Sequence, residues 1–452
     1  MGQPEEPKLD YRGKRILAPM VRACTLPMRL LALSYGADIV YSEEIVDLKL
    51  LQCERLENSA YGTIDYKEKS SGDIVFRTHP DEKRAVVLQI GTADPDMAAQ
   101  VAALVENDVA GLDINMGCPK NYSVLGGMGA ALLTKPDLVE KILRAARAKF
   151  SKSLTCKIRL LPNVEDTVAL VKRIAATGVD AIAVHGRTKD ERPRHKNRLD
   201  VIAMLAKAVD IPVIANGSSA DVHSFEDMEK FLLASGASSV MIARSVQRNP
   251  SLFRREGKLP KEQIILDYLK KSIHYDRNFR NSKYSVQHFF GDTSTELGQR
   301  LLATRDFREL CQVFQMEEYD DEQLLLRGIY PDERPGEKAR AAAGTKRLHE
   351  EMSEESGAAG IMSESLDYEP IGKRLKKVKN SKTPKSLLLE HCVREGIAAA
   401  HVNFSGADRG FRGSIVIDGR TFTSTVPHKT KKDAEQACML VALKHLIKGF
   451  EI

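Results

Sequence analysis

Short apolar runs alternate with longer amphipathic stretches over the N-terminal half of the chain. Eight of these runs are rich in branched aliphatic residues, which is typical of parallel strands buried on both faces. The stretches between most of them, such as MAAQVAALVEN and EDTVALVKRIAATG, repeat apolar residues three and four positions apart, which predicts helices. Eight strand-and-helix units close a (β/α)8 TIM barrel, which we expect over residues 12–258. The runs begin at Arg15, Asp38, Ala85, Gly111, Leu154, Ala181, Ile211 and Ser238.

Polar and charged residues return at the C-terminal end of every run. In a closed barrel these ends meet in one ring, which is where barrels bind their ligands. An open doubly wound sheet is the alternative, and in it about half of these residues would only cap loops. The residues are Met20, Arg22, Glu43, Glu44, Gln89, Asn115, Lys157, Arg159, His185, Arg187, Asn216 and Arg244.

The rest of the chain divides into three parts. Residues 259–330 show helical periodicity without strands, so we expect a helical domain. Residues 331–372 are polar and poor in aromatics, so they cannot bury enough apolar surface to fold and are expected to form a disordered linker. Residues 373–452 follow with a basic N-terminal extension and then a helix, three strands and a helix, with a turn at Asp418-Gly419. The last helix carries an apolar stripe formed by Ala434, Ala437, Cys438 and Val441.

The composition is that of a globular protein of several domains. The 452 residues are 42% hydrophobic and 29% charged, with a formal net charge of +6, which excludes disorder throughout. No run approaches the roughly 18 apolar residues of a membrane helix, and the first residues lack an apolar leader, so we expect a cytoplasmic protein without membrane contact. The seven cysteines are scattered without a Cys-x-x-Cys pair, which argues against a disulfide scaffold and against a metal site.

One cysteine lies in a setting that favours chemistry. The stretch NMGCPKNYSVLGGMGAALL, from Asn115, places Cys118 between Gly117 and Pro119, directly after the fourth predicted strand and before a glycine-rich loop. We therefore expect Cys118 to face a ligand at the barrel mouth. A thiol with the ordinary pKa of about 8.5 is mostly protonated at neutral pH and can donate a proton. The alternative for a lone cysteine is a small buried apolar residue.

The NMGCP motif occurs with LAPM at Leu17, CKIR at Cys156, HGR at His185, IANG at Ile214 and MIAR at Met241. Together these motifs, in this order, resemble the tRNA-dihydrouridine synthases over nearly all of residues 12–330. The segment KTKKDAEQACMLVAL resembles the second helix of a double-stranded RNA-binding domain, which we expect within residues 373–452 as an α-β-β-β-α fold. The combination is similar to the eukaryotic branch of the synthases that reduces uridine 20 in the tRNA D-loop.

The resemblance implies a barrel that binds FMN and is reduced transiently by NADPH. A lysine at position 157 has an independent physical reason, because a fixed cation stabilises the negative charge of a reduced flavin. The alternative for Lys157 is an ion pair with Glu43 or Glu44. Ser218 departs from the glycine usual in the family, so its backbone contact to phosphate is less secure. The implied cofactor residues are Pro19, Met20, Glu44, Gln89, Lys157, His185, Asn216, Gly217, Ser218, Ala243 and Arg244.

The resemblance also implies the reaction. Reduced flavin would deliver hydride to C6 of a uracil flipped into the mouth, and Cys118 would protonate C5 from the other face. Asn115 and Arg187 would hold the uracil edge, and Arg159 is a further candidate for this contact. Each of these three residues could instead be a structural loop residue.

The expected partner is tRNA, bound by a monomer. Phosphate contacts supply most of the affinity for a folded RNA. In the helical domain the basic stretch with Arg277, Arg280 and Tyr284 is assigned to the tRNA surface, with a solvated face as the alternative. The loop GADRGFRG lacks the His-containing signature common in the RNA-binding module, so the basic extension is expected to compensate. The lysines assigned to RNA are Lys283, Lys373, Lys376, Lys377, Lys429, Lys431 and Lys432.

Two other functions fit parts of the pattern. One is a flavin barrel that reduces a small pyrimidine, against which the RNA-binding segment argues. The other is a non-catalytic regulator that binds double-stranded RNA, against which the presence of Cys118 together with the FMN set argues.

Overall fold

The computed structural model describes residues 8–327, 361–362, 388, 402–407, 410–417, 420–423 and 431–446. The chain divides into two compact units, Met1–Lys338 and Ala339–Ile452. No helix within these described segments is both long and apolar enough to cross a bilayer.

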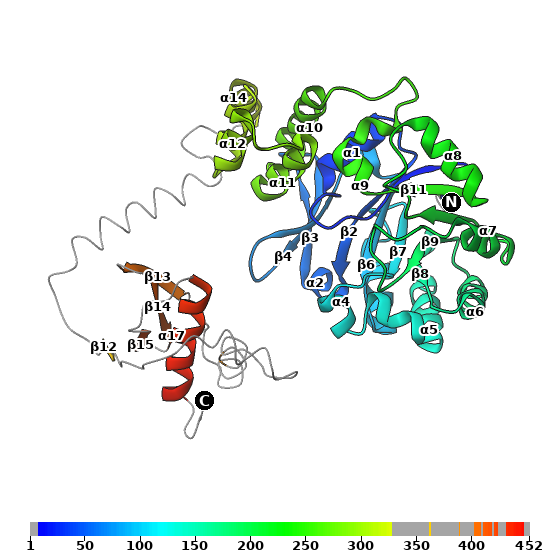
Figure 1. Cartoon of the computed structure of the whole chain (residues 1–452), viewed down its shortest axis with the longest axis horizontal. Coiled ribbons are helices and arrows are strands. Elements are labelled where there is room, and N and C mark those ends of the chain that lie inside the picture. The colour runs from blue at the N-terminus through cyan, green and yellow to red at the C-terminus, as the bar shows by residue number, and fades with distance from the viewer. Residues whose placement is uncertain are drawn as a thin grey trace. The chain divides into compact units, whose positions relative to one another are not determined.

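The eight apolar runs of the sequence form the eight strands of a barrel (Figure 1). They are β1 (Arg15–Leu17), β2 (Ile39–Val46), β6 (Val86–Gly91), β7 (Gly111–Met116), β8 (Ser153–Leu160), β9 (Ala181–Thr188), β10 (Val213–Asn216) and β11 (Ser239–Ile242). The strands pair in parallel in the closed order β1-β11-β10-β9-β8-β7-β6-β2. The predicted (β/α)8 barrel is therefore confirmed, and the open sheet is excluded.

Amphipathic helices cover the outside of the barrel. Asn163 shows how one of them begins, because its side chain accepts a hydrogen bond from the Glu165 amide, and the helix then buries Leu170 and Ile174 against the strands. A second apolar cluster, with Ile16, Ala183 and Met241 among its members, fills the interior, since alternate strand residues point inward. The outer helices are α1 (Leu26–Ser34), α3 (Pro95–Val105), α5 (Pro136–Arg147), α6 (Val164–Ala175), α7 (Leu199–Lys207) and α8 (Phe225–Ser235).

A small antiparallel sheet between β2 and β6 was not predicted from the sequence. It consists of β3 (Cys53–Asn58), β4 (Thr63–Glu68) and β5 (Ile74–Thr78), in the order β3-β4-β5. The short helix α2 (Asp47–Leu51) precedes it and the 3-10 helix η1 (Pro80–Glu82) follows it. Gly62 and Gly72 have positive φ angles between these strands, which favour glycine.

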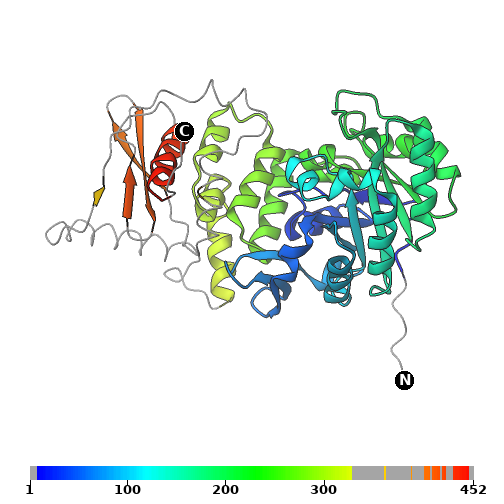
Figure 2. The same ribbon diagram turned by 90° about the horizontal axis from the view of Figure 1, so that it is seen from below.

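Five helices follow the barrel without strands, in agreement with the helical pattern of the sequence (Figure 2). They are α10 (Lys261–Tyr275), α11 (Phe279–Phe290), α12 (Glu296–Ala303), α13 (Phe307–Val313) and α14 (Glu317–Leu326). Helix α10 packs against α1, and the five helices belong to the same compact unit as the barrel. Their division from the barrel as a separate domain stays a prediction.

The assignment of Arg277 to an RNA surface was wrong. Its guanidinium forms a buried ion pair with Asp320 and lies over the Phe307 ring. Arg280, three residues later, is exposed. The sequence alone therefore does not show whether such a side chain faces solvent or a buried partner, because the partner of Arg277 lies more than 40 residues away.

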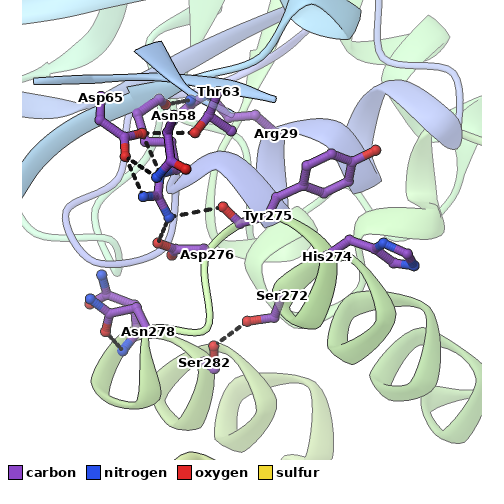
Figure 3. A network of polar contacts seen from close by, with 12 residues as sticks. Arg29, Asn58, Thr63, Asp65, Ser272, His274, Tyr275, Asp276, Asn278 and Ser282 are labelled. Atoms are coloured by element: carbon purple, nitrogen blue, oxygen red, sulfur yellow. Dashed lines mark hydrogen bonds and ion pairs between the residues drawn. The ribbon is translucent and has the colours of Figure 1, made fainter. Parts of the chain in front are cut away.

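A buried charge network joins the inserted sheet to the helices (Figure 3). The Arg77 guanidinium on β5 forms two hydrogen bonds with the Asp65 carboxylate on β4, at 2.6 and 2.5 Å. Its Nη1 also donates to the Tyr275 carbonyl oxygen at 3.0 Å and lies 3.5 Å from Asp276 Oδ1. Burial raises the pKa of Asp276 to about 6, although Arg77 opposes the shift.

We expect Asp276→Asn to be more stable than the wild type near pH 7.5 by about 3 kcal/mol. The pKa of Asp276 is higher in the folded than in the unfolded state, so its charged form lowers the free energy of unfolding above pH 6, and this loss disappears as the pH falls through 6 toward 4. Urea unfolding of both proteins across this range measures the difference, which should nearly vanish at pH 4. A less stable variant at pH 7.5 would show that the contact with Arg77 outweighs the cost of burial.

The second unit contains a four-stranded sheet with one described helix. The sheet order is β12 (Ile361–Met362), β15 (Arg420–Thr423), β14 (Gly410–Ile417) and β13 (Val402–Ala407), and the helix is α17 (Lys431–Leu446). A Cβ at Gly413 would lie 2.5 Å from the Ala434 carbonyl oxygen, so glycine allows this close approach of α17. The predicted stripe on α17 is buried as expected, at Ala434, Ala437, Cys438 and Val441.

Several predictions lie outside the described residues. These are the linker over 331–372, apart from Ile361 and Met362, and the basic residues Lys373, Lys376, Lys377 and Lys429. Of the predicted first helix in this unit, only Leu388 is described, and it is helical and buried.

Candidate active site

The strand register brings the predicted polar residues to one end of the barrel. Residues that directly oppose each other on neighbouring strands lie side by side, so the register places several of these residues next to one another at the mouth. The paired positions are Glu44 with Gln89, Asn115 with Lys157, Arg159 with His185, and His185 with Asn216.

A buried amide and carboxylate network lies under these residues. Gln89 Nε2 donates to Asp113 Oδ2 at 2.8 Å, and Asn115 Nδ2 donates to Gln89 Oε1 at 3.0 Å. Thr155 donates its hydroxyl proton to the other Asp113 oxygen at 2.6 Å. Burial raises the pKa of Asp113 to about 6, while the two donors and the charge of Lys157 oppose the shift. Asp113, which the sequence analysis did not name, therefore fixes the orientation of Gln89.

Asn115 holds the cysteine loop in place. Its Oδ1 accepts hydrogen bonds from the backbone amides of Gly117 at 3.0 Å and Cys118 at 2.9 Å. An amide oxygen has two lone pairs, and both are used in this way. Asn115 was expected to hold the uracil edge, and only its second Nδ2 hydrogen remains for this contact.

The glycine-rich segment closes over the same loop. It contains α4 (Asn121–Leu125) and the 3-10 helix η2 (Gly129–Thr134). The Ala130 amide donates to the Cys118 carbonyl oxygen at 3.0 Å. Gly129 has a positive φ of 57°, and a Cβ there would lie 2.7 Å from that carbonyl oxygen and 2.4 Å from Ser123 Oγ. Only glycine allows this approach without displacing Cys118.

The thiol of Cys118 is half-buried. Its Sγ lies 3.8 Å from the Tyr122 hydroxyl, and that hydroxyl donates to Glu44 Oε2 at 3.0 Å. The other oxygen, Glu44 Oε1, is buried without a hydrogen-bond partner among the described residues. Burial raises the pKa of Cys118, so the group is a thiol at neutral pH.

Basic side chains lie on the strands that follow the cysteine loop, β8 and β9. Burial lowers the pKa of Lys157 to about 8, and the charge of Arg159 adds to the shift. Burial and four neighbouring cations lower the pKa of His185 far below its ordinary range, so this imidazole is neutral. Lys157 has no ion pair with a described residue, which disfavours its alternative interpretation as a partner of Glu43 or Glu44. Uncompensated cations in such a concave site favour an anionic ligand.

Two of the predicted substrate residues donate to the backbone. Arg187 is only 3% exposed, and its donors reach the carbonyl oxygens of His195, Gly217 and Pro193 at 2.7, 2.5 and 3.2 Å, and His185 Nε2 at 3.2 Å. Arg159 donates at 2.9 Å to the carbonyl oxygens of Gly117 and Thr188. Both arginines therefore fix loops at the mouth. Most N–H groups of Arg187 are used in these bonds, as expected for a structural loop residue.

The ends of β10 and β11 form a corner suited to a phosphate. Gly217 has a φ of 120°, and a Cβ there would lie 2.6 Å from Asn197 Oδ1. Asn197 Nδ2 donates to Ser218 Oγ at 2.9 Å, so the Ser218 hydroxyl proton remains available for a ligand. Arg244, at the start of α9 (Arg244–Arg248), is exposed and makes no ion pair with a described residue. Asn197 was not predicted from the sequence.

The remaining predicted cofactor residues lie at the same end of the barrel. Pro19 and Met20 follow β1 and are partly buried, and Ala243 follows β11. Asn216 Nδ2 donates to the Met241 carbonyl oxygen at 2.8 Å, which connects the ends of β10 and β11.

The predicted RNA-binding lysines fall into different settings. Lys283 Nζ donates to the carbonyl oxygens of Leu302 at 2.8 Å and Thr304 at 2.6 Å, at the end of α12. These bonds satisfy carbonyls that the helix leaves unpaired and leave one ammonium hydrogen for an RNA. Lys431 and Lys432 are the first two residues of α17.

Comparisons with known proteins identify both parts of the chain. Residues 16–317 match the family Dihydrouridine synthase (Dus), and residues 384–446 match the double-stranded RNA binding motif. The chain is 40% identical over 320 residues to the tRNA-dihydrouridine(20) synthase (NAD(P)+) of Schizosaccharomyces pombe, covering 68% of this chain and 66% of that relative. It is 39% identical over 297 residues to the protein of the same name from Saccharomyces cerevisiae, covering 62% of this chain and 77% of the relative.

A solved structure of a tRNA-dihydrouridine(20) synthase dsRBD domain is 27% identical, with a TM-score of 0.18, and the match covers 21% of this chain and 94% of that structure. The family match extends over nearly the whole barrel and most of the helices that follow, including the six motifs LAPM, NMGCP, CKIR, HGR, IANG and MIAR. The chain belongs to the dihydrouridine synthase family.

Proposed function

We propose that this protein reduces the C5–C6 double bond of a uridine in tRNA, at position 20 of the D-loop, to form dihydrouridine. The observation that carries the proposal is the position of Cys118. A thiol is held by Asn115 and Gly129 at a barrel mouth where the neighbouring strand β8 carries the cations Lys157 and Arg159. The names of the yeast relatives support the choice of position 20.

The residues present fit FMN. Among the described residues, Glu44 Oε1 is a buried acceptor without a hydrogen-bond partner and Lys157 is a partly buried cation without an ion pair, and Gly217 leaves room for close approach of a phosphate. When bound, the flavin would supply hydride to C6 of the uracil and would itself be reduced by NADPH. The residues that would hold it are Pro19, Met20, Glu44, Gln89, Lys157, His185, Asn216, Gly217, Ser218, Ala243 and Arg244.

The chain's own contribution to the chemistry is a proton and a set of fixed charges. Cys118 would give its S–H proton to C5, leaving a thiolate. Lys157 would place a positive charge beside the cofactor at no reorganisation cost, because burial already fixes it. Asn115 through Nδ2, with Arg159 and Arg187 through their remaining donor hydrogens, would orient the uracil.

The second unit would supply affinity for the RNA, and Lys431 and Lys432 are the proposed phosphate contacts on α17. We expect the double variant Lys431→Ala/Lys432→Ala to bind tRNA more weakly and to reduce the slope of log affinity against log salt by up to about 2. Filter binding at several salt concentrations measures both quantities. Reduction of the bound flavin by NADPH should be unchanged. Loss of this reduction would contradict the assignment of RNA binding to the second unit and of flavin chemistry to the barrel. The expected cytoplasmic localisation and monomeric state stay predictions.

Mass spectrometry of tRNA tests the proposed function. Unmodified tRNA is incubated with purified, flavin-loaded protein and NADPH, and nuclease fragments are searched for a uridine that has gained two hydrogens. A parallel reaction with free uridine monophosphate tests the small-pyrimidine alternative. A product in the fragment with uridine 20 supports the proposal, whereas an unmodified tRNA or a preference for the free nucleotide would contradict it.

A further inference from the structure

Three side chains from two elements form a line at the mouth. Glu44 lies on β2, and Cys118 and Tyr122 lie on the loop and short helix after β7. The Tyr122 hydroxyl is 3.0 Å from Glu44 Oε2 on one side and 3.8 Å from Cys118 Sγ on the other. The Tyr122 side chain is 51% exposed, so the hydroxyl contacts, rather than burial of the ring, distinguish this position.

The Tyr122 phenol has only one proton, so the group that receives this proton decides which way the hydrogen bonds between the three side chains run. A phenol carries one proton and can also accept a hydrogen bond. The Tyr122 proton is donated to the Glu44 carboxylate, because a charged acceptor binds it more strongly than a neutral sulfur does. The phenol oxygen therefore faces Cys118 as an acceptor, which is satisfied by an S–H group and not by a thiolate.

Several groups around Cys118 favour loss of the thiol proton. Lys157 and Arg159 on β8 lie close enough to interact electrostatically with the sulfur, and positive charges favour a thiolate. The backbone amide of Lys120 acts in the same direction, and so would the Tyr122 hydroxyl if it donated its proton to the sulfur instead of to Glu44. A thiolate has no proton to give to a substrate carbon. Glu44 is the one carboxylate found near the sulfur within the described part of the chain, and its negative charge favours the thiol.

We propose that Glu44 and Tyr122 act as positioning residues that keep Cys118 protonated. Glu44 accepts the Tyr122 hydroxyl proton in a hydrogen bond, and the Tyr122 oxygen accepts the hydrogen bond of the thiol. The usefulness of this arrangement depends on the proposed function, since it preserves the proton that C5 would receive. The arrangement itself does not require substrate, so it can be measured in the protein alone.

The test is the pH dependence of alkylation at Cys118. Purified protein is treated with iodoacetamide between pH 6 and 10, and the modified peptide that contains Cys118 is quantified by mass spectrometry. Tyr122→Phe removes the acceptor at an exposed position, and Glu44→Gln removes the charge but keeps an oxygen that can accept from Tyr122. We expect both variants to shift the alkylation midpoint to lower pH, by about half to one pH unit. Leu125→Ala, on the same short helix and 86% exposed, is the matched control and should not shift it.

The direction of the shift in Tyr122→Phe decides between two roles of the hydroxyl. If Tyr122 instead donated to a thiolate, its removal would raise the midpoint, and that result or an unmoved midpoint would overturn the inference. The pH profile of dihydrouridine formation provides a second readout, and its alkaline limb should move to lower pH in both variants. A shifted alkylation midpoint in a protein that forms no dihydrouridine would refute the proposed function alone, whereas full activity with an unmoved midpoint would refute this inference alone.

Discussion

Replacing Cys118 by alanine is expected to lower dihydrouridine formation at least about 100-fold while the bound flavin is retained. A positioned general acid contributes roughly 100-fold to 10,000-fold to a rate, and the other described cysteines are all buried. The flavin should stay bound because its proposed contacts come from the strand ends, and the Asn115 bonds to the loop involve backbone amides that alanine retains. Visible absorbance measures the flavin, and mass spectrometry of tRNA measures the product.

Two further variants make the result for Cys118 specific. Cys53→Ala removes a buried thiol at the start of the inserted sheet and is expected to leave the rate unchanged. Cys118→Ser keeps a hydroxyl of similar size that is far less acidic than a thiol, so it should remain strongly impaired. Undiminished product formation by Cys118→Ala would rule out the proton-donor role.

The barrel could be predicted because its strands are buried on both faces. Such strands appear in the sequence as continuous apolar runs, and the position where polarity returns marks the ligand-binding end. The position of Asp113 could have been inferred from the sequence through its spacing from Asn115. They are two positions apart on β7, so they point to the same side of the strand, and Asp113 could have been placed beside Asn115 in the interior.

The inserted sheet shows where the apolar signal fails. Strands β3 and β4 mix buried, partly buried and exposed residues without a regular alternation and carry charges such as Glu54 and Lys67, so no continuous apolar run marks them. The turn glycines Gly62 and Gly72 were the indication in the sequence.

The direction of a charged side chain could not be predicted either. Arg277 and Lys283 are neighbours in one basic stretch, yet Arg277 pairs with Asp320, and Lys283 donates to the end of α12. Tyr122 is a similar case, since its role depends on Glu44, which lies 78 positions earlier in the chain. Sequence spacing shows which residues share an element, whereas these partners come from distant elements.

Glu82→Gln is expected to lower the free energy of unfolding by about 3 to 5 kcal/mol, because it leaves the Arg29 charge buried without its counterion. Glu82 is 0% exposed and Arg29 is 2% exposed. Their two hydrogen bonds measure 2.6 and 2.8 Å, and Thr78 donates to the same carboxylate at 2.9 Å. The guanidinium also donates to two backbone carbonyl oxygens, so it cannot turn toward water without breaking the contact between α1 and the end of the inserted sheet. Urea unfolding at pH 7 measures the loss.

The double variant Arg29→Met/Glu82→Leu separates the cost of an unpaired charge from the value of the pair itself. Transferring two opposite charges from water to a buried site costs several kcal/mol per ion, so replacing both with apolar residues removes that cost along with the attraction. We therefore expect the double variant to be more stable than Glu82→Gln, although it removes more polar contacts. Asp137→Asn breaks an exposed pair with Arg173 and should change the unfolding midpoint little, because water screens that pair. If the double variant were less stable than the single one, the bonds of Arg29 to the backbone, rather than its pairing with Glu82, would be what holds the inserted sheet to α1.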